Sequence, residues 1–299
     1  MFRTLASMAV LTLAWGMNWS VMKIGVAQLP PLWFRALALV LGTALLGVVL
    51  AMRGASFRVP PGGAWRIVRL AVPNIVLWYG LVTVAITMLP AGRAAILGYT
   101  MPVWAALIGA WRYREPIDGR TGVGLACALA GIALLVAGDW TALAGHPLGV
   151  VLMLAASVSW AWGTHALKRS TLPVDTLMLT FWMMVVACPA ILGASALFEG
   201  ARWRWPAGAE WGPIAYNGVL VLALGNLIWF AVARALPATT AGLSSMLIPV
   251  VGVFSGMAVL GETPPWRDFA ALALVCAAVA AAIPRRAPPP VARPAEGLP

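Results

Sequence analysis

The chain has 299 residues, of which 62% are hydrophobic and only 10% are charged. Its mean hydropathy is +0.91, whereas about a quarter of the residues in an ordinary soluble domain are charged. This balance excludes a soluble globular enzyme, a disordered regulator and a nucleic-acid-binding protein. The net charge of +11 comes from basic residues that lie between long apolar runs, where Lys and Arg set the orientation in a bilayer. We therefore expect a polytopic membrane protein surrounded by lipid.

Ten stretches of the sequence are long and apolar enough to cross a bilayer, for which a helix needs about 20 residues. They are 4–24, 31–51, 67–88, 92–111, 120–138, 147–167, 175–197, 212–233, 238–260 and 268–284. Continuous apolar runs favour an all-α protein over a barrel, whose strands alternate in hydrophobicity. The first stretch is too long for a signal peptide and contains Asn18 and Lys23, so we expect it to be retained.

The basic residues predict the orientation of these stretches. With the N-terminus inside, fourteen of the twenty Lys and Arg residues fall on the cytoplasmic side. The other six are Lys23, Arg35, Arg93, Arg202, Arg204 and Arg267. This asymmetry favours cytoplasmic termini at both ends, with residues 285–299 as a disordered tail. The Arg, Ala and Gly usage suggests a bacterial chain, and hence the inner (plasma) membrane.

The two halves of the chain align at an offset of 147 residues. The aligned pairs include Trp15 with Trp162, Asn18 with His165, Pro102 with Pro249 and Glu115 with Glu262. Each half has five stretches, so the second copy must enter the membrane from the opposite side. We predict two inverted-topology five-helix repeats, residues 1–138 and 139–284, around a central cavity. Repeats of this kind support alternating access.

Matching motifs occur on both halves, and they point to a known family. They are Trp15-Gly16, Trp19, Lys23, Pro31, Arg35, Pro102, Glu115, Arg120, Pro249, Glu262 and Arg267. Over residues 5–284 the chain resembles the drug/metabolite transporter superfamily, in its ten-helix EamA-type branch. The resemblance implies a cavity lined by the first, third, fourth, sixth, eighth and ninth helices, with the fifth and tenth peripheral. The most similar branch looks like the bacterial amino-acid exporters, including those for aromatic amino acids.

Polar and aromatic residues on those stretches are the candidate substrate-binding residues. They are Trp15, Asn18, Trp19, Trp78, Tyr79, Tyr99, Trp162, His165, Asn226, Trp229, Ser244 and Ser245. Trp15, Asn18 and Trp19 share one helix face through their spacing. Trp160 and Trp162 lie about 200° apart on their helix, and the repeat favours Trp162. Helix packing for the Trp residues and interhelical hydrogen bonds for the Asn residues are the alternatives.

Two prolines, Pro102 and Pro249, are predicted to break their helices and to gate the cavity. Each proline frees a backbone carbonyl one turn earlier. In a membrane such a group is tolerated only where side chains, neighbouring helices or a wet cavity satisfy it.

The positions of the charged residues limit the classes of substrate that we expect. All nine acidic residues fall in loops, tails or ends of stretches, which disfavours cationic drugs, and Lys23 and Arg35 are placed at external ends, which disfavours phosphorylated solutes. The sequence thus predicts an exporter of amino acids or related small metabolites, aromatic ones favoured, that works by facilitated uniport. The alternatives are a proton-coupled exporter of other neutral metabolites or drugs, with His165 as the relay, and a membrane scaffold without transport.

The sequence contains no residue pattern that is typical of an enzyme active site. No carboxylate stands beside either histidine, and no GxxxxGK[ST] motif occurs. The three cysteines lie in apolar stretches without metal-ligand spacing, so we expect no cofactor and no metal. Small residues such as Gly122, Gly124 and Gly131 permit close helix packing, within one chain or in a homodimer.

Overall fold

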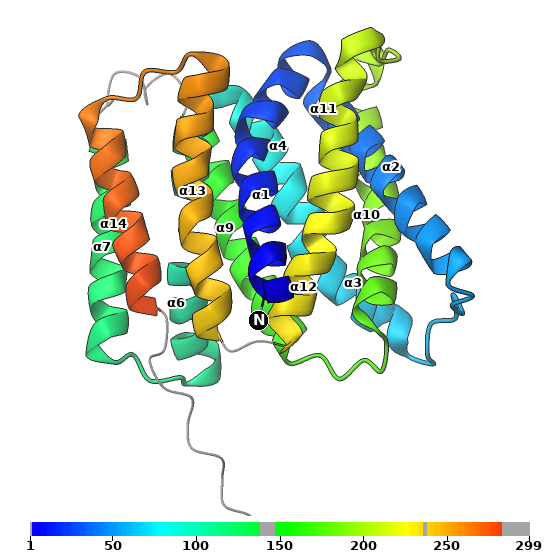
Figure 1. The fold of residues 1–299 in the computed structure, drawn as a ribbon, viewed down its shortest axis with the longest axis horizontal. Helices are drawn as coiled ribbons and strands as arrows, with labels where there is room; N and C mark the ends of the chain where they lie inside the picture. The colour runs from blue at the N-terminus through cyan, green and yellow to red at the C-terminus, as the bar shows by residue number, and fades with distance from the viewer. Residues whose placement is uncertain (1, 138–146, 236–237, 283–299) are drawn as a thin grey trace, which may run out of the picture.

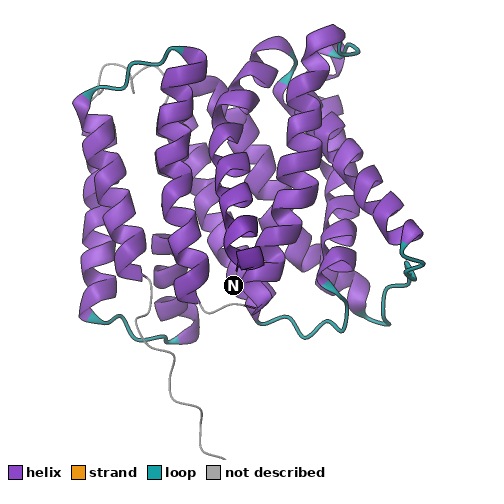
Figure 2. Cartoon of the chain, viewed as in Figure 1, coloured by secondary structure: helices purple, strands orange, loops and turns teal. Residues whose placement is uncertain are grey.

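The protein is described here by a computed structural model, which covers residues 2–137, 147–235 and 238–282 and is helical throughout (Figures 1 and 2). The first half comprises α1 (Phe2–Gln28), α2 (Pro31–Met52), α3 (Gly63–Ala71), η1 (Val72–Leu77), α4 (Trp78–Met88), α5 (Ala91–Gly98), α6 (Met101–Tyr113) and α7 (Gly119–Ala137). The second half comprises α9 (Pro147–Lys168), α10 (Thr176–Glu199), η2 (Gly200–Arg202), η3 (Gly208–Glu210), α11 (Trp211–Ala215), η4 (Tyr216–Gly225), α12 (Asn226–Ala235), α13 (Ala238–Leu260) and α14 (Trp266–Ala282).

Helical segments occupy all ten predicted stretches, so the all-α prediction is confirmed. Six helical runs within the described residues are long and apolar enough to cross a membrane. They are Pro31–Met52, Gly63–Met88, Ala91–Tyr113, Pro147–Lys168, Thr176–Arg202 and Gly208–Val232. Shorter apolar helices cover Gly119–Leu135 and Leu247–Leu260. The predicted tail at residues 285–299 lies outside the described residues.

The helices pack in pairs that follow the repeat found in the sequence. Helix α2 packs on α10, and α7 packs on α14, so each of these pairs joins equivalent helices of the two halves. Helix α1 packs on α13, and its counterpart α9 packs on α6 in the same way. The third helix of each half also contains a π-helical segment at an equivalent place, η1 in one and η4 in the other.

Charged side chains at the upper end of the bundle in Figure 1 cap helix ends. The Lys23 ammonium on α1 donates to the carbonyls of Ile86 and Leu89 at the end of α4, at 2.8 and 2.6 Å. The Glu262 carboxylate accepts from the backbone N–H groups of Ala91 and Gly92 at the start of α5, at 2.6 and 3.1 Å. A cation at a helix C-terminus and an anion at an N-terminus are the favourable arrangement for the helix dipole. The junction of α4 and α5 is therefore held by α1 and by the loop between α13 and α14.

Helices α7 and α14 form the left edge of the bundle in Figure 1, at the periphery. A Cβ atom on Gly124 would lie 3.0 Å from the carbonyl oxygen of Ala278, and one on Gly131 would lie 3.3 Å from that of Ala271. A Cβ on Gly122 would meet nothing within 4 Å. The small residues on α7 thus serve packing within the chain at Gly124 and Gly131.

We expect Gly124→Leu to destabilise the protein and Gly122→Leu, on the same helix, to leave stability unchanged. Overpacking of a close contact costs about 1–3 kcal/mol, so the first variant should lose its monodisperse fraction at a lower temperature in detergent. The measurement is the midpoint of heat-induced aggregation of purified protein. Equal midpoints for the two variants would contradict the close packing of α7 on α14.

Candidate binding pocket

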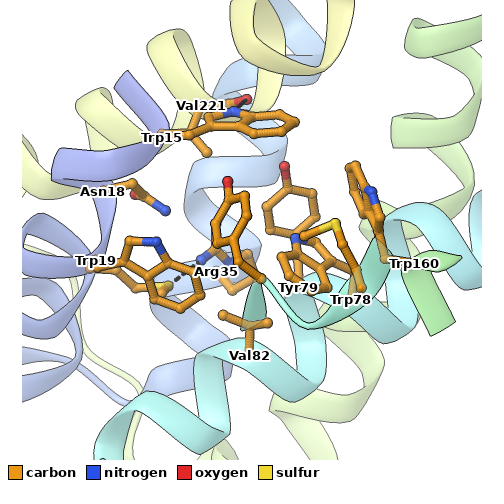
Figure 3. A pocket seen from close by; sticks show the side chains of 12 residues that line it. Trp15, Asn18, Trp19, Arg35, Trp78, Tyr79, Val82, Trp160 and Val221 are labelled. Atoms are coloured by element: carbon orange, nitrogen blue, oxygen red, sulfur yellow. Dashed lines mark hydrogen bonds between the residues drawn. The ribbon is translucent and has the colours of Figure 1, made fainter. Parts of the chain in front are cut away.

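A narrow pocket lies in the middle of the bundle, between α1, α2, α4, α9, η4 and the junction of α5 with α6 (Figure 3). Its cavity volume of about 30 Å³ holds only two or three waters, since a water needs roughly 10–15 Å³ by this measure. A solute the size of an amino acid can enter only if helices or side chains move. The pocket is lined by Trp15, Asn18, Trp19, Met22, Arg35, Trp78, Tyr79, Val82, Tyr99, Met101, Trp160 and Val221.

Helix α1 supplies one continuous face of this pocket. Trp15, Asn18, Trp19 and Met22 follow one another at spacings of three or four residues, and all four are at least nine-tenths buried. The two indoles fit against glycines of neighbouring helices. A Cβ on Gly225 would lie 2.2 Å from Nε1 of Trp15. The indole of Trp15 can occupy this place only because position 225 has no side chain.

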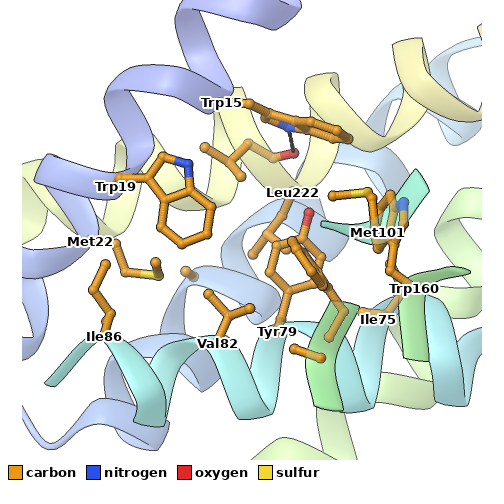
Figure 4. Packing of buried hydrophobic residues seen from close by; sticks show 14 of the residues in the cluster. Trp15, Trp19, Met22, Ile75, Tyr79, Val82, Ile86, Met101, Trp160 and Leu222 are labelled. Carbon is orange, nitrogen blue, oxygen red and sulfur yellow. Dashed lines mark hydrogen bonds between the residues drawn. The ribbon is translucent and has the colours of Figure 1, made fainter. Parts of the chain in front are cut away.

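Four indoles form a connected aromatic group on one side of the pocket, which we call the indole cluster: Trp15, Trp78, Trp160 and Trp229. Trp160 lies at its centre, with ring centroids 5.9 Å from Trp15, 5.1 Å from Trp78 and 6.2 Å from Trp229. These separations are those of favourable edge-to-face and offset aromatic pairs. Figure 4 shows Trp15, Trp19 and Trp160 around apolar side chains such as Met22 and Val82.

The preference for Trp162 over Trp160 is wrong, because the structure turns the other face of α9 to the pocket. Trp160 is 2% exposed and lines the pocket, while Trp162 is 41% exposed and does not. The rotation of α9 is set by its contact with η1. The Ser159 hydroxyl donates to the carbonyl of Pro73 at 2.8 Å, and a Cβ on Gly163 would lie 2.5 Å from the Asn74 amide. Aligning the two halves of the sequence cannot reveal this contact between α9 and η1.

His165 also lies away from the pocket, near the lower end of α9. Its Nε2 is 2.8 Å from the carbonyl oxygen of Ala105, and its Nδ1 is 2.9 Å from a guanidinium nitrogen of Arg169. Arg169 in turn pairs with Glu115 at 2.7 Å and covers the ring of Tyr113. A guanidinium can only donate, so Nδ1 accepts and Nε2–H donates. We call His165, Arg169, Glu115 and Tyr113 the lower-end cluster.

The Tyr79 hydroxyl donates to the Asn226 carboxamide oxygen at 3.0 Å. These residues are repeat partners, so equivalent positions of the two halves meet beside the pocket. Trp229 contacts the indole cluster from α12 but does not line the pocket. Ser244 and Ser245 belong to α13, and their side chains lie outside the described part of the structure.

The two prolines differ. Pro102 stands in the first turn of α6, directly after the break at Tyr99 and Thr100. The carbonyl of Gly98, which this proline leaves without an intrahelical donor, accepts from the Ser157 hydroxyl at 2.9 Å. Pro249 lies within α13, which runs unbroken past it, so the predicted helix break is found at Pro102 and not at Pro249.

The position of Arg35 differs most from the expectation. It was placed at an external helix end, yet its side chain is fully buried and lines the pocket. Its Nε donates to the Thr83 hydroxyl at 2.8 Å, and Nη1 donates to the Asn217 carboxamide oxygen at 3.1 Å. The only signal in the sequence was its position one turn inside the second stretch. The pocket therefore contains a cation.

Three polar atoms of pocket-lining residues are buried and have no hydrogen-bond partner within the described structure. They are Oδ1 of Asn18 and Nε1 of Trp19 and Trp160. Unsatisfied buried polar groups are rare and call for an explanation. One acceptor and one donor on α1 and a second donor on α9 suit a polar ligand with an apolar body. Within the described residues, no group of three His, Cys, Asp or Glu side chains could hold a metal ion.

Comparison with known proteins assigns the family. The EamA-like transporter family matches residues 3–137 and again residues 147–283. The chain belongs to this family. It is thus a multi-pass membrane protein of the drug/metabolite transporter superfamily, and its family and relatives are named as transporters and not as enzymes.

Several relatives match this EamA-type chain over about nine-tenths of its length. An uncharacterized transporter, YoaV of Bacillus subtilis, is 24% identical over 93% of this chain and 96% of its own. The uncharacterized inner membrane transporter YedA of Escherichia coli K12 is 29% identical over 90% and 87%. A probable amino-acid metabolite efflux pump of the same strain is 24% identical over 89% and 90%. A solved crystal structure has the same fold, with a TM-score of 0.66 at 20% identity over 93% of this chain and 96% of that one.

The helices that line the pocket of this EamA-type protein differ from the expected set in two respects. The ninth helix, α13, was expected to line the cavity, but none of its described side chains lines this pocket. The first, third, fourth, sixth and eighth helices contribute side chains, through α1, α4, the α5–α6 junction, α9 and η4. The second helix was not expected to contribute, yet it provides Arg35. Helices α7 and α14 contribute no side chain to this pocket.

We expect the Tyr79–Asn226 hydrogen bond to couple the two halves energetically. A double-mutant cycle with Tyr79→Phe and Asn226→Leu, measured by SDS-driven unfolding in mixed micelles, should give a coupling of about 0.6 kcal/mol and at most about 1.7 kcal/mol. The control cycle pairs Asn226→Leu with Tyr216→Phe, because Tyr216 donates elsewhere, to the carbonyl of Ala14 at 2.9 Å. Equal coupling in both cycles would refute a specific link.

Proposed function

We propose that this protein exports amino acids or related small metabolites across the bacterial inner membrane, with aromatic amino acids favoured. One observation carries the proposal. A pocket at the middle of the bundle combines the indole cluster with three buried polar atoms that have no partner. One of these atoms is the indole N–H of Trp160, within the cluster, and the other two belong to Asn18 and Trp19. The full-length relative named as a probable amino-acid metabolite efflux pump supports the same substrate class.

The pocket chemistry matches a solute with an apolar ring and a small polar head. Indole faces stack on aromatic rings and attract an ammonium group, each contact contributing about 0.5–1.5 kcal/mol. The free oxygen of Asn18 can accept from an ammonium, and the two indole N–H groups can donate to a carboxylate. No acidic side chain lines the pocket, and the buried cation of Arg35 repels cationic drugs.

Transport by this fold requires the pocket to open to one side at a time. We propose that the two halves, residues 1–138 and 139–284, are inverted five-helix repeats with ten membrane-crossing helices and cytoplasmic termini. Contacts exist on both sides of the pocket. The hydroxyls of Ser20 on α1 and Ser255 on α13 are 2.8 Å apart towards the upper end, and the lower-end cluster joins α6 to α9. Alternate breaking of these contacts would expose the pocket to either side.

The energy source in this proposal is the substrate gradient. Proton-coupled transporters use ionisable groups within the membrane as relays, and no carboxylate or histidine lines the pocket. His165 lies outside the pocket, and both of its ring nitrogens are engaged, one with the Ala105 carbonyl and one with Arg169. A facilitator is therefore favoured over the proton-coupled alternative. Monomer and homodimer are both compatible with this mechanism.

The first test compares Trp160→Ala with Trp162→Ala, two variants of one helix that differ in which face they change. In proteoliposomes loaded with labelled tryptophan, phenylalanine or threonine, we expect wild-type efflux to be saturable and fastest for the aromatic pair. Trp160→Ala should reduce efflux about tenfold or more, equivalent to about 1.4 kcal/mol, while Trp162→Ala retains it. Absence of saturable efflux of all three amino acids would overturn the proposed substrates. Equal loss in both variants would remove the pocket as the site.

The second test concerns coupling. We expect tryptophan efflux to be insensitive to an imposed pH gradient, and His165→Gln to leave both its rate and this insensitivity close to wild type, because a glutamine amide can still donate to the Ala105 carbonyl. The measurement is efflux at equal internal and external pH and across a gradient of two units in each direction. A gradient-driven acceleration that His165→Gln abolishes would establish the proton-coupled alternative.

A further inference from the structure

We infer that Arg35 binds the carboxylate of the transported solute, so that this pocket selects carboxylate-bearing substrates over the corresponding amines. This inference rests on the proposed function and identifies a specificity-determining residue within it. Arg35 lies on α2, a helix with no other side chain in the pocket, and its guanidinium faces the pocket between Trp19 and Tyr79 (Figure 3).

The first support is the absence of a counter-charge. Arg35 is 0% exposed, and no carboxylate among the described residues forms an ion pair with it. The nearest compensation is aromatic, with the guanidinium carbon 5.0 Å from the ring centroid of Tyr79 and 5.7 Å from that of Phe34. A buried cation without an anionic partner is unfavourable, and an ionisable residue inside a membrane is a candidate functional group by default. An anionic substrate would supply the missing charge.

The second support is the count of hydrogen-bond donors. A guanidinium has five N–H groups, and Arg35 uses Nε for Thr83 and one N–H of Nη1 for Asn217. Nη2 contacts the sulfur of Met22 at 2.8 Å, and a thioether is a weak acceptor. One N–H on each terminal nitrogen therefore has no partner within the described structure. A guanidinium with a free N–H on each terminal nitrogen can bind a carboxylate through two hydrogen bonds.

The third support is how rigidly the guanidinium is held. Thr83 on α4 and Asn217 on η4 fix two of its nitrogens, and Tyr79 lies against it. The Trp19 indole lines the same pocket and has a free N–H. A carboxylate on Arg35 would leave the ring of an aromatic amino acid to the indole cluster and its ammonium to the free oxygen of Asn18. Because the guanidinium is already held in place, little conformational entropy is lost when it binds a substrate.

A purely structural role for Arg35 is the alternative, since it links α1, α2, α4 and η4 through its contacts. The two roles differ in one measurable respect. Loss of a purely structural contact weakens binding of all ligands alike, whereas loss of a carboxylate anchor weakens only the ligands that carry a carboxylate.

The experiment measures binding of three probes to the full-length protein in nanodiscs by calorimetry. The probes are L-tryptophan, indole-3-propionate, which lacks the ammonium, and tryptamine, which lacks the carboxylate. We expect wild type to bind both carboxylates about tenfold or more tightly than tryptamine. Arg35→Lys keeps the charge without the fork, and Arg35→Gln removes the charge. Both variants should weaken the two carboxylates about tenfold or more, with the larger loss for Gln. Neither variant should weaken tryptamine, and Arg35→Gln should tighten it, because the cation that repels its ammonium is gone.

The controls separate the possible failures. Arg66→Gln removes an exposed cation whose contact is the Thr171 hydroxyl, and it should change none of the affinities. Equal weakening of all three probes in the Arg35 variants would establish the structural role and overturn the anchor.

If neither variant folds, a measurement on wild type alone decides. In that case the affinities for L-tryptophan and for its carboxamide are compared, and equal affinity would overturn the anchor. A wild type that binds none of the probes overturns the proposed aromatic substrates and the anchor with them, whereas equal binding of all three overturns the anchor alone.

Discussion

The structure depends on one constraint, that a polar group inside an apolar bundle must find its partner within the protein. Water is not available in the bilayer core to satisfy a free carbonyl or N–H. Breaks in helices therefore occur where side chains from other helices reach them. Lys23 and Glu262 hold the two sides of the α4–α5 junction, and Ser157 satisfies the carbonyl that Pro102 leaves free. Charged residues at helix ends in this apolar chain serve largely as such caps.

The same constraint shapes the pocket, and glycines on neighbouring helices leave room for its aromatic side chains. Gly225 makes room for Trp15, and Gly98 makes room for Trp19, whose ring would lie 2.9 Å from a Cβ at that position. Two indoles of α1 are thereby accommodated between helices that approach closely. Three polar atoms in the pocket lack partners, and the guanidinium of Arg35 lacks an anionic one, so the pocket departs from this rule. Exceptions of this kind are what a binding site for a polar solute requires.

The two halves share their packing but not the chemistry of equivalent positions. Trp15 on α1 lines the pocket, whereas its repeat partner Trp162 lies on the outer face of α9, and Trp160 takes the corresponding place. Asn18 faces the pocket, while its partner His165 belongs to the lower-end cluster. Equivalent helices of the two halves can thus turn different side chains towards the pocket. The repeat informs the arrangement of helices more reliably than the role of a side chain.

The sequence alone determined the all-helical class, the positions of the helices and the family, because runs of about 20 apolar residues and matching motifs are local signals. It also placed Trp15, Asn18 and Trp19 on one helix face, since their spacing depends only on helix geometry. Only the tertiary structure decided that Arg35 is buried in the pocket, that Trp160 faces it, and that His165 does not. These outcomes depend on how each helix is rotated and how deeply it sits. Contacts between distant residues, such as Gly163 with Asn74 and Arg35 with Asn217, set the rotation and depth of the helices, and no local pattern encodes them.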